Sequence, residues 1–514
     1  MKKKYIGIIG IVVIAGGILI SATINIRQSI QTFSTVFNTV LRNYVQEVSP
    51  SDLIQYAING MLQRLDPHTV YLDTTSYKEL KIHTSGEYGG LGFMVGKLKN
   101  VITIMETFEG TPAYRAGLQA GDEIIEIDSI SAKGISINEA VTKMRGTAGT
   151  SVILKVKKEG IKEPIDFHLT REKIKIRNVV YSGVISSNIG YIRIAQFSAN
   201  TGGDVGRVLD SLVLQGANKF IIDLRGNPGG LLVEAINVSD HFLPKGKLIV
   251  STKGRVPETN RDYYATVGSK IGTAPIIVLV NKYSASASEI VAGAIQDWDA
   301  GLIVGDTTIG KGSVQTLFPL ESGAIKLTTA TYHTPSGRCI NQLDTTLFLF
   351  RNPSLGKKYT TLGPLKRELV AGGSIVPDVV CEPVVSLSPL LFNETKLPPP
   401  LLITVGGKGA FIHYASKYAR EHPKLTHDFK IGNTILQDFK SYIRTQEIEF
   451  TDVQFDSVSQ FVGEALKEAI FEAMWGTEGK YEAILAQDKW IRTSVDIISK
   501  ANTSAELLKN EGIK

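Results

Sequence analysis

Cysteine is scarce in this chain, which has only Cys339 and Cys381 among 514 residues. This excludes a disulfide-dense scaffold and any cysteine-rich metal site. One disulfide between the two cysteines and a pair of buried free thiols both remain open. None of the eight histidines forms an HExxH pair, so the sequence lacks that zinc-protease motif. We expect neither a metal nor an organic cofactor.

Charge of one sign is also sparse, because the formal net charge is only +6. The lysines are scattered rather than interleaved with aromatic residues, which gives no strong case for nucleic-acid binding. A hydrophobic fraction of 43% with 21% charged residues is ordinary for globular cores. The length predicts three or four domains.

The N-terminus predicts a membrane-directed segment. Lys2, Lys3 and Lys4 precede an uncharged, mostly apolar stretch over residues 5–24. We assign residues 1–26 as a signal peptide or membrane anchor, and the length of the stretch favours an uncleaved anchor. The lysines favour a cytoplasmic N-terminus, so the rest of the chain would lie outside the cytoplasm, in the periplasm or cell envelope, anchored or exported.

A serine-rich turn carries the first candidate catalytic residue. The apolar run over residues 274–280 predicts a buried strand, and the sequence SASASEIVAGAIQD from Ser284 to Asp297 predicts a turn entering a helix. Ser286 would lie at the helix N-terminus, where backbone N–H groups stabilise an oxyanion. The alternative is a simple helix cap. We interpret Glu289 as a capping-box partner rather than a catalytic acid.

Lys311 is the candidate base, 25 residues after Ser286 in the sequence GDTTIGKGSVQ. A lysine accepts a proton only when its pKa falls towards neutrality, and the apolar residues on both sides of Lys311 predict the necessary burial. If residues 312–318 form a strand, Gln315 could hydrogen-bond the amine without adding charge. The alternative is a solvated surface lysine.

These segments resemble those of the carboxyl-terminal processing peptidases, serine/lysine proteases that carry a PDZ domain. The resemblance implies that Ser286 is the nucleophile, Lys311 the general base and Gln315 the residue that orients the lysine. It also implies oxyanion donors at Ala287 N–H and at Gly229 or Gly230, within the sequence IIDLRGNPGGLL. The implied fold of the protease core is α/β and similar to the crotonase and ClpP folds.

Other chemistries have weaker support. His333 is the candidate for a Ser/His/Asp triad, because triad partners need not be close in sequence. The only SxxK tetrad, Ser354–Lys357, lies between Pro353 and Gly356 and is expected to be loop. Asp297 matches an acidic position of the family, and we expect it to make a structural hydrogen bond.

Residues 78–160 predict the PDZ domain. The tetrapeptide GLGF occupies residues 90–93, and GTPAYRAGLQAGDEIIEID follows from Gly110. The glycines would expose N–H groups to a terminal carboxylate, and a neighbouring strand edge would pair with an extended peptide. Arg145 could couple peptide occupancy to the protease, or form an ordinary surface ion pair. The predicted peptide-binding residues are Gly90, Leu91, Gly92, Phe93 and Arg145.

The remaining boundaries give an α/β multidomain chain. Residues 27–77 predict a helical N-terminal region ending in LDPHTVYL, in which we interpret His68 as structural. Residues 173–385 predict the serine protease core, with an insertion at 341–373 that we expect to contact substrate or a partner. Residues 386–514 predict a helical C-terminal extension for assembly or regulation.

The predicted function is a serine endopeptidase that recognises apolar C-termini of extracytoplasmic proteins and processes or degrades those proteins. Protein or peptide substrates, the membrane and a second copy of the chain are its expected partners. One alternative is a non-hydrolytic PDZ scaffold or chaperone for extracytoplasmic clients. Another is a hydrolase of a non-protein ester or amide, which the PDZ domain disfavours.

Overall fold

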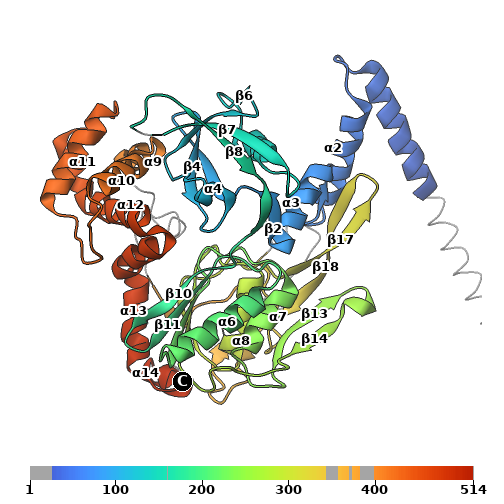
Figure 1. Ribbon diagram of the computed structural model, residues 1–514. Helices are drawn as coiled ribbons and strands as arrows, with labels where there is room; N and C mark the ends of the chain where they lie inside the picture. The colour runs from blue at the N-terminus through green and yellow to red at the C-terminus, as the bar shows by residue number, and fades with distance from the viewer. Residues whose placement is uncertain (1–25, 159, 343–356, 370–372, 382–398, 513–514) are drawn as a thin grey trace, which may run out of the picture.

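The computed structural model describes residues 26–158, 160–342, 357–369, 373–381 and 399–512. Figure 1 shows the predicted PDZ domain above the protease core, with the N-terminal helices on one side and a bundle of C-terminal helices on the other. The predicted membrane segment falls on residues outside these ranges, apart from Ile26. Within the described ranges, no helix combines the length and apolar character needed to cross a membrane.

The N-terminal region is helical and joins the core through one short strand. Residues 26–43 are helical, and α2 (Pro50–Gln63) and α3 (Thr74–Ser85) follow. Asp73 caps α3, and Gly86 ends it with φ of 69°, a conformation that favours glycine. The LDPHTVYL segment contributes a strand instead of a helix. This strand, β1 (Val70–Leu72), pairs antiparallel with β18 (Gly323–His333) of the core.

The PDZ domain is built on a six-stranded antiparallel sheet in the order β3-β4-β5-β7-β8, with β6 paired to β5. The domain extends past the predicted end at residue 160, because the chain turns after β7 and returns as β8 to pair with it. A separate pair, β2 (Glu87–Gly90) with β9 (Glu172–Lys175), leads out of the domain. The other elements are β3 (Phe93–Leu98), β4 (Val101–Thr107), α4 (Pro112–Arg115), β5 (Glu123–Ile127), β6 (Ile130–Ser131), α5 (Ile137–Met144), β7 (Ser151–Lys157) and β8 (Ile165–Thr170).

The protease core centres on a six-stranded sheet in the order β10-β11-β12-β15-β16-β21, parallel from β11 onwards. The strand predicted over residues 274–280 is present as β15, and the residues of β11, β12 and β15 are buried on both faces. The strands are β10 (Val179–Ser186), β11 (Ile189–Ile194), β12 (Lys219–Asp223), β15 (Ile276–Val280), β16 (Leu302–Gly305) and β21 (Val379–Val380).

Helices cover one face of this sheet, and a second sheet lies beside it. The covering helices are α6 (Thr201–Leu214), α7 (Leu232–Asp240) and α8 (Ala287–Asp297), whose apolar residues share a cluster with the strand residues of that face. The second sheet is antiparallel and joins β1, β18, β13 (Leu248–Gly254), β14 (Arg261–Tyr264) and β17 (Ser313–Leu320).

The other face of the central sheet is covered by the end of the chain. Trp490, Ile491 and Ile498 of α13 (Lys489–Ser499), with Leu507 and Leu508 of α14 (Ser504–Asn510), pack against the sheet. Figure 1 shows these helices, in red, beside β10 and β11. The assignment of residues 386–514 to one extension is therefore wrong. Its final part is a layer of the protease core, and no local pattern in the sequence shows which distant strands it covers.

The rest of the C-terminal region forms a helical domain that packs on the PDZ domain. Its helices are α9 (Pro400–Gly407), α10 (Ala410–Glu421), α11 (Asn433–Thr445) and α12 (Asp452–Gln487), which is kinked at Trp475 and Gly476. Ser416 Oγ donates a hydrogen bond of 3.2 Å to Ala120 O, and Lys99 Nζ lies 2.9 Å from Gln446 Oε1. The helical domain therefore contacts the PDZ domain directly, and its α12 also contacts β10 of the core.

The described part of the predicted insertion packs on the core. Residues 357–369 contain a short antiparallel pair, β19 (Tyr359–Thr360) with β20 (Glu368–Leu369). The buried Arg367 lies 2.8 Å from Asp299 and 2.5 Å from Asp378. This part of the insertion therefore anchors the chain before β21, while residues 347–350 lie outside the described ranges. Cys339 and Cys381 are both buried, and no disulfide joins them.

Replacing Trp490 by alanine tests whether the end of the chain belongs to the core. Trp490 is 2% exposed, and its removal leaves a large cavity against the sheet. We expect the free energy of unfolding to fall by about 3–5 kcal/mol, measured by chemical denaturation. Val453→Ala, on the exposed side of α12, is the control and should change it by less than about 0.5 kcal/mol. Equal stability of the two variants would contradict this assignment.

Candidate active site

Ser286 occupies a strained turn between β15 and α8. Its backbone has φ of 54° and ψ of −111°, which a residue with a side chain rarely adopts. Ser284 fixes the turn, because its hydroxyl donates a 2.8 Å hydrogen bond to Leu224 O. The predicted helix begins at the next residue, Ala287. Ser286 is thus presented at a helix N-terminus, as the sequence predicts.

The Glu289 carboxylate joins the serine turn to the lysine segment. Its Oε2 accepts hydrogen bonds of 2.8 Å from both Ser286 N–H and Lys311 N–H. Its Oε1 accepts from the Thr308 hydroxyl at 2.6 Å and from Gly310 N–H at 2.8 Å. The bond from Ser286 confirms Glu289 as the predicted capping-box partner. The contact to Lys311 goes beyond capping, because one carboxylate oxygen fixes both candidate residues.

Burial raises the pKa of Glu289 to about 7, while its four hydrogen bonds act in the opposite direction. The side chain is fully buried. An ionised Glu289 accepts all four donors, whereas a protonated one must present an O–H to some of them. The connection between Ser286 and Lys311 is therefore sensitive to pH near neutrality.

Lys311 has the electrostatic setting that a base requires. Partial burial lowers the pKa of its amine, the charge of Lys326 lowers it further, and Glu289 opposes the shift. Among the described interactions, none joins Ser286 Oγ directly to Lys311 Nζ. Catalytic hydrogen bonds are often loose without substrate, so backbone placement is the informative feature here.

Tyr332, which the sequence reasoning missed, lies between the two candidate residues. Its buried hydroxyl donates to the Lys311 carbonyl and is within hydrogen-bond reach of the Ser286 side chain. Burial raises the pKa of Tyr332 well above its usual value, so the phenol stays neutral. The only feature of the sequence that marks Tyr332 is its position two residues before the turn-forming sequence TPSGR, Thr334–Arg338.

Gln315 forms no described hydrogen bond with Lys311, so its orienting role stays a prediction. Its Nε2 donates to Ser313 Oγ at 2.8 Å and lies 3.3 Å from Thr328 Oγ1. The predicted strand is present as β17, but its register with β18 shifts between Val314 and Gln315. This irregularity breaks the strict alternation on which the prediction rested.

The two predicted oxyanion segments meet beside Ser286. A side chain at Gly229, whose φ is 93°, would clash with Ala285 O at 2.6 Å and Ser286 Cβ at 2.7 Å. The Gly229 N–H is already used, because it donates 2.8 Å to Asn227 Oδ1. Within the described residues, the N–H groups of Gly230 and Ala287 have no acceptor. Of the two glycines, Gly230 therefore has the available donor.

The LDPHTVYL segment reaches the surroundings of Lys311. Asp66 accepts from Thr69 Oγ1 at 2.7 Å and from Thr328 Oγ1 at 3.1 Å, which fixes the turn against β18. Burial lowers the pKa of the His68 imidazole, and the charge of Lys311 lowers it further. The sequence indicated a motif here but not that it faces the candidate base.

The competing residues have other partners. The ring nitrogens of His333 lie 3.2 Å from Thr331 Oγ1 and 3.2 Å from Gly337 O, so this imidazole does not contact Ser286. Asp297 makes the expected structural contacts, accepting from Arg338 at 2.5 Å and Ser336 N–H at 2.8 Å. Ser354 lies outside the described residues. No cluster of metal-ligating side chains occurs in the described part of the chain.

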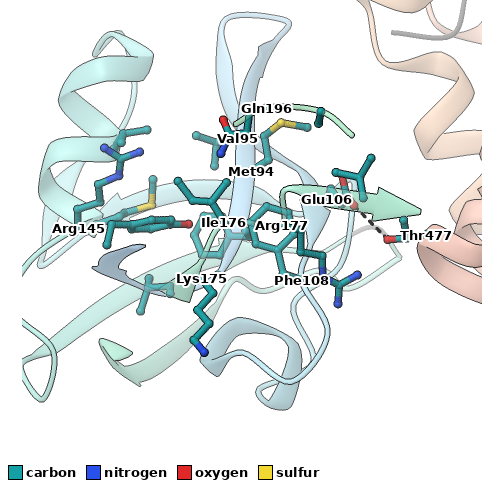
Figure 2. A pocket seen from close by; sticks show the side chains of 18 of the residues that line it. Met94, Val95, Glu106, Phe108, Arg145, Lys175, Ile176, Arg177, Gln196 and Thr477 are labelled. Atoms are coloured by element: carbon teal, nitrogen blue, oxygen red, sulfur yellow. Dashed lines mark hydrogen bonds between the residues drawn. The ribbon is translucent and has the colours of Figure 1, made fainter. Parts of the chain in front are cut away.

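The predicted peptide-binding residues of the PDZ domain line a cavity of about 460 Å³. Leu91, Gly92, Phe93 and Arg145 contribute to its wall, together with residues of α5, of the linker after β9 and of α12 (Figure 2). Gly90 ends β2 just before this wall. Arg145 forms a 2.7 Å ion pair with Glu79 of α3 and lies over the Tyr88 ring. It therefore connects the PDZ domain to the N-terminal region.

Comparison with protein-family models agrees with this architecture. Residues 188–346 match peptidase family S41, and residues 108–158 match a PDZ domain. Residues 20–76 match the N-terminal domain of the activating protease CtpB, and residues 402–471 match the C-terminal helical domain of a probable PDZ-protease. All four matches fall on separate parts of the chain.

The chain belongs to the carboxy-terminal processing proteases, serine-type S41 peptidases that carry a PDZ domain. It is 41% identical to such a protease of Bartonella bacilliformis over 68% of this chain and 81% of that protein. It is 40% identical to one of Picosynechococcus over 56% of this chain and 70% of that protein. A solved photosystem II D1 C-terminal processing protease is 26% identical, covering 70% of this chain and 94% of the other, with a TM-score of 0.37.

Glu289→Gln tests the carboxylate that joins Ser286 to Lys311. Folding raises the pKa of Glu289 from 4.5 to about 7. Between these two pH values, Glu289 is therefore protonated in the native state and ionised in the unfolded state. This proton stabilises the folded state fully below pH 4.5, and the stabilisation is lost as the pH rises through about 7. We expect the wild type to lose about 3 kcal/mol relative to Glu289→Gln over this interval.

Chemical denaturation of both proteins between pH 4.5 and 8 measures this difference. Glutamine cannot accept from all four donors, so we also expect a lower kcat for the variant at pH 8. Parallel stability profiles of the two proteins would show that Glu289 does not titrate in this range.

Proposed function

We propose that the protein cleaves peptide bonds with Ser286 as nucleophile and Lys311 as general base, acting on extracytoplasmic proteins whose C-termini its PDZ domain captures. The observation that carries this proposal is the shared Glu289 oxygen, which holds the backbones of both residues. The lowered pKa of Lys311 supports its role as proton acceptor.

In this mechanism, Ser286 Oγ attacks the substrate carbonyl while its proton passes to the neutral Lys311 amine. The negative charge then develops on the carbonyl oxygen, and the unused N–H groups of Gly230 and Ala287 are placed to stabilise it. The Lys311 ammonium protonates the leaving amine, which leaves an acyl ester on Ser286. Water, deprotonated by Lys311, hydrolyses that ester and restores the serine.

The geometry of the PDZ domain supports capture of an extended peptide. β3 is an edge strand of its sheet, since its one described partner is β4. A peptide can add to this edge with its terminal carboxylate at the N–H groups of residues 90–93. Leu91 and Phe93 line the adjoining cavity and supply apolar surface for the last side chain. Through its ion pair with Glu79, Arg145 would transmit occupancy to the protease.

Location and assembly complete the proposal. The apolar stretch over residues 5–24 supports membrane tethering or export. Ile26, Ile30 and Phe33 are 54–63% exposed along one helix, which supports self-association through this region. The alternative of a non-hydrolytic scaffold has less support, because it gives no reason for a strained serine beside two unused N–H groups.

Ser286→Ala and Lys311→Ala should each lower the cleavage rate by about a thousandfold or more, because each removes a reacting group. The measurement is cleavage of an unfolded reporter with an apolar C-terminal tail. Both variants should retain folding and tail binding. Lys282→Ala, an exposed lysine near the same turn, is the control and should retain activity. Normal turnover by either catalytic variant would refute the dyad.

The last residue of the substrate tests the PDZ assignment. Replacing an apolar terminal residue by aspartate would place a charge against Leu91 and Phe93. We expect binding to weaken by about tenfold or more, as measured by fluorescence anisotropy with the Ser286→Ala protein. Unchanged affinity would show that these residues do not receive the terminal side chain.

A further inference from the structure

The PDZ cavity has a wall that the PDZ domain does not provide. Lys175, Ile176 and Arg177 line it from the linker between the PDZ domain and the core, and Ala195 and Gln196 line it from the end of β11. Gln196 precedes Phe197, whose N–H donates 3.0 Å to Gly229 O. The cavity therefore extends from the GLGF loop to Gln196, next to the residue that bonds Gly229.

Some of the charged side chains along this cavity have a partner of opposite charge, and others have none. Arg145 is paired with Glu79, and Lys480 lies 3.0 Å from Glu472. Glu106, the one carboxylate on the wall, accepts from the Thr477 hydroxyl at 3.3 Å. Lys175 and Arg177 are different, because within the described residues neither side chain forms an ion pair or hydrogen bond.

Lys175 would be expected to form an ion pair with a carboxylate on the neighbouring strand β2, but it does not. Glu87 lies opposite Lys175 in the β2–β9 register, yet it forms its ion pair with Lys173. Both Lys175 and Arg177 are exposed, so each remains available to a bound molecule. The linker thus carries two uncompensated positive charges beside the cavity, and their charged ends point in different directions (Figure 2).

We propose that Lys175 and Arg177 form a specificity site for an acidic side chain of the substrate, located upstream of the C-terminal residue held by the GLGF loop. This inference rests on the proposed capture of C-termini by the PDZ domain. A chain that leaves the PDZ groove for Ser286 has to pass the linker between the two domains. An aspartate or glutamate there would meet one of these two cations, so the preferred ligand combines an apolar last residue with an upstream acid.

Binding of labelled peptides to the full chain carrying Ser286→Ala tests the site. The reference peptide has neutral residues and a free apolar C-terminus, and aspartate or lysine replaces each upstream position in turn. We expect aspartate at one or two positions to tighten binding about three- to tenfold over the reference, and lysine to weaken it. High salt should remove most of the difference.

Variants of the protein locate the effect. Lys175→Gln with Arg177→Gln should abolish the preference for aspartate while leaving the reference peptide bound as before. Arg177→Glu should shift the preference towards lysine. Lys173→Gln, a neighbouring exposed cation that is paired with Glu87 and does not line the cavity, is the matched control and should retain the preference.

A peptide with an amidated C-terminus tests the cationic site separately from the proposed capture of C-termini by the PDZ domain. Weak binding of the amide together with equal binding of aspartate and lysine peptides would overturn the cationic site and leave capture of C-termini intact. Equal binding of free and amidated peptides would overturn both.

Discussion

Glu289 holds two distant parts of the chain together at the candidate active site. The serine turn follows one strand of the core and the lysine segment follows the next, and neither local structure places the other. The fully buried carboxylate accepts backbone hydrogen bonds from both segments through a single oxygen, and Thr308 and Gly310 use the other. Burying this charge is costly unless it is well solvated by donors, so its four hydrogen bonds are a condition of the arrangement. The pKa near 7 shows how closely these effects balance.

The oxyanion segment depends on a second buried network that ends in the C-terminal helices. Arg225, which begins the RGNPGG turn, lies 2.6 Å from Asp223 and 2.7 Å from Asp488 at the start of α13. Trp490 of the same helix packs against the face of the central sheet that α6, α7 and α8 do not cover. The end of the chain thus supports both the packing of the core and the turn that carries Gly230. Removing one partner of such a buried pair leaves an uncompensated charge, which links the C-terminus to the geometry of the site.

Local sequence patterns predicted the parts of the site that local structure determines. Ser286 at a helix N-terminus, Glu289 as its capping partner and the apolar strands of the core follow from residue type and period. The orienting role of Gln315 stays a prediction, because the register shift in β17, which has no signature in the sequence, breaks the strict alternation that suggested it. Tyr332 and His68 were not assigned to the site because their approach to Lys311 depends on the pairing of β18 with β17 and β1. The placement of α13 and α14 was missed for the same reason, since an amphipathic helix does not specify the face that it covers.

The central claim is that Lys311 serves as the base for Ser286, with an amine whose pKa is lowered from the ordinary lysine value. An NMR titration of the Lys311 side-chain amine, assigned by comparison with Lys311→Arg, measures this most directly. We predict a pKa below the ordinary lysine value of about 10.5, because burial and the charge of Lys326 both disfavour the ammonium. We also predict that Lys326→Gln raises this pKa. An amine that titrates at or above the ordinary value in the folded protein would contradict the proposed dyad.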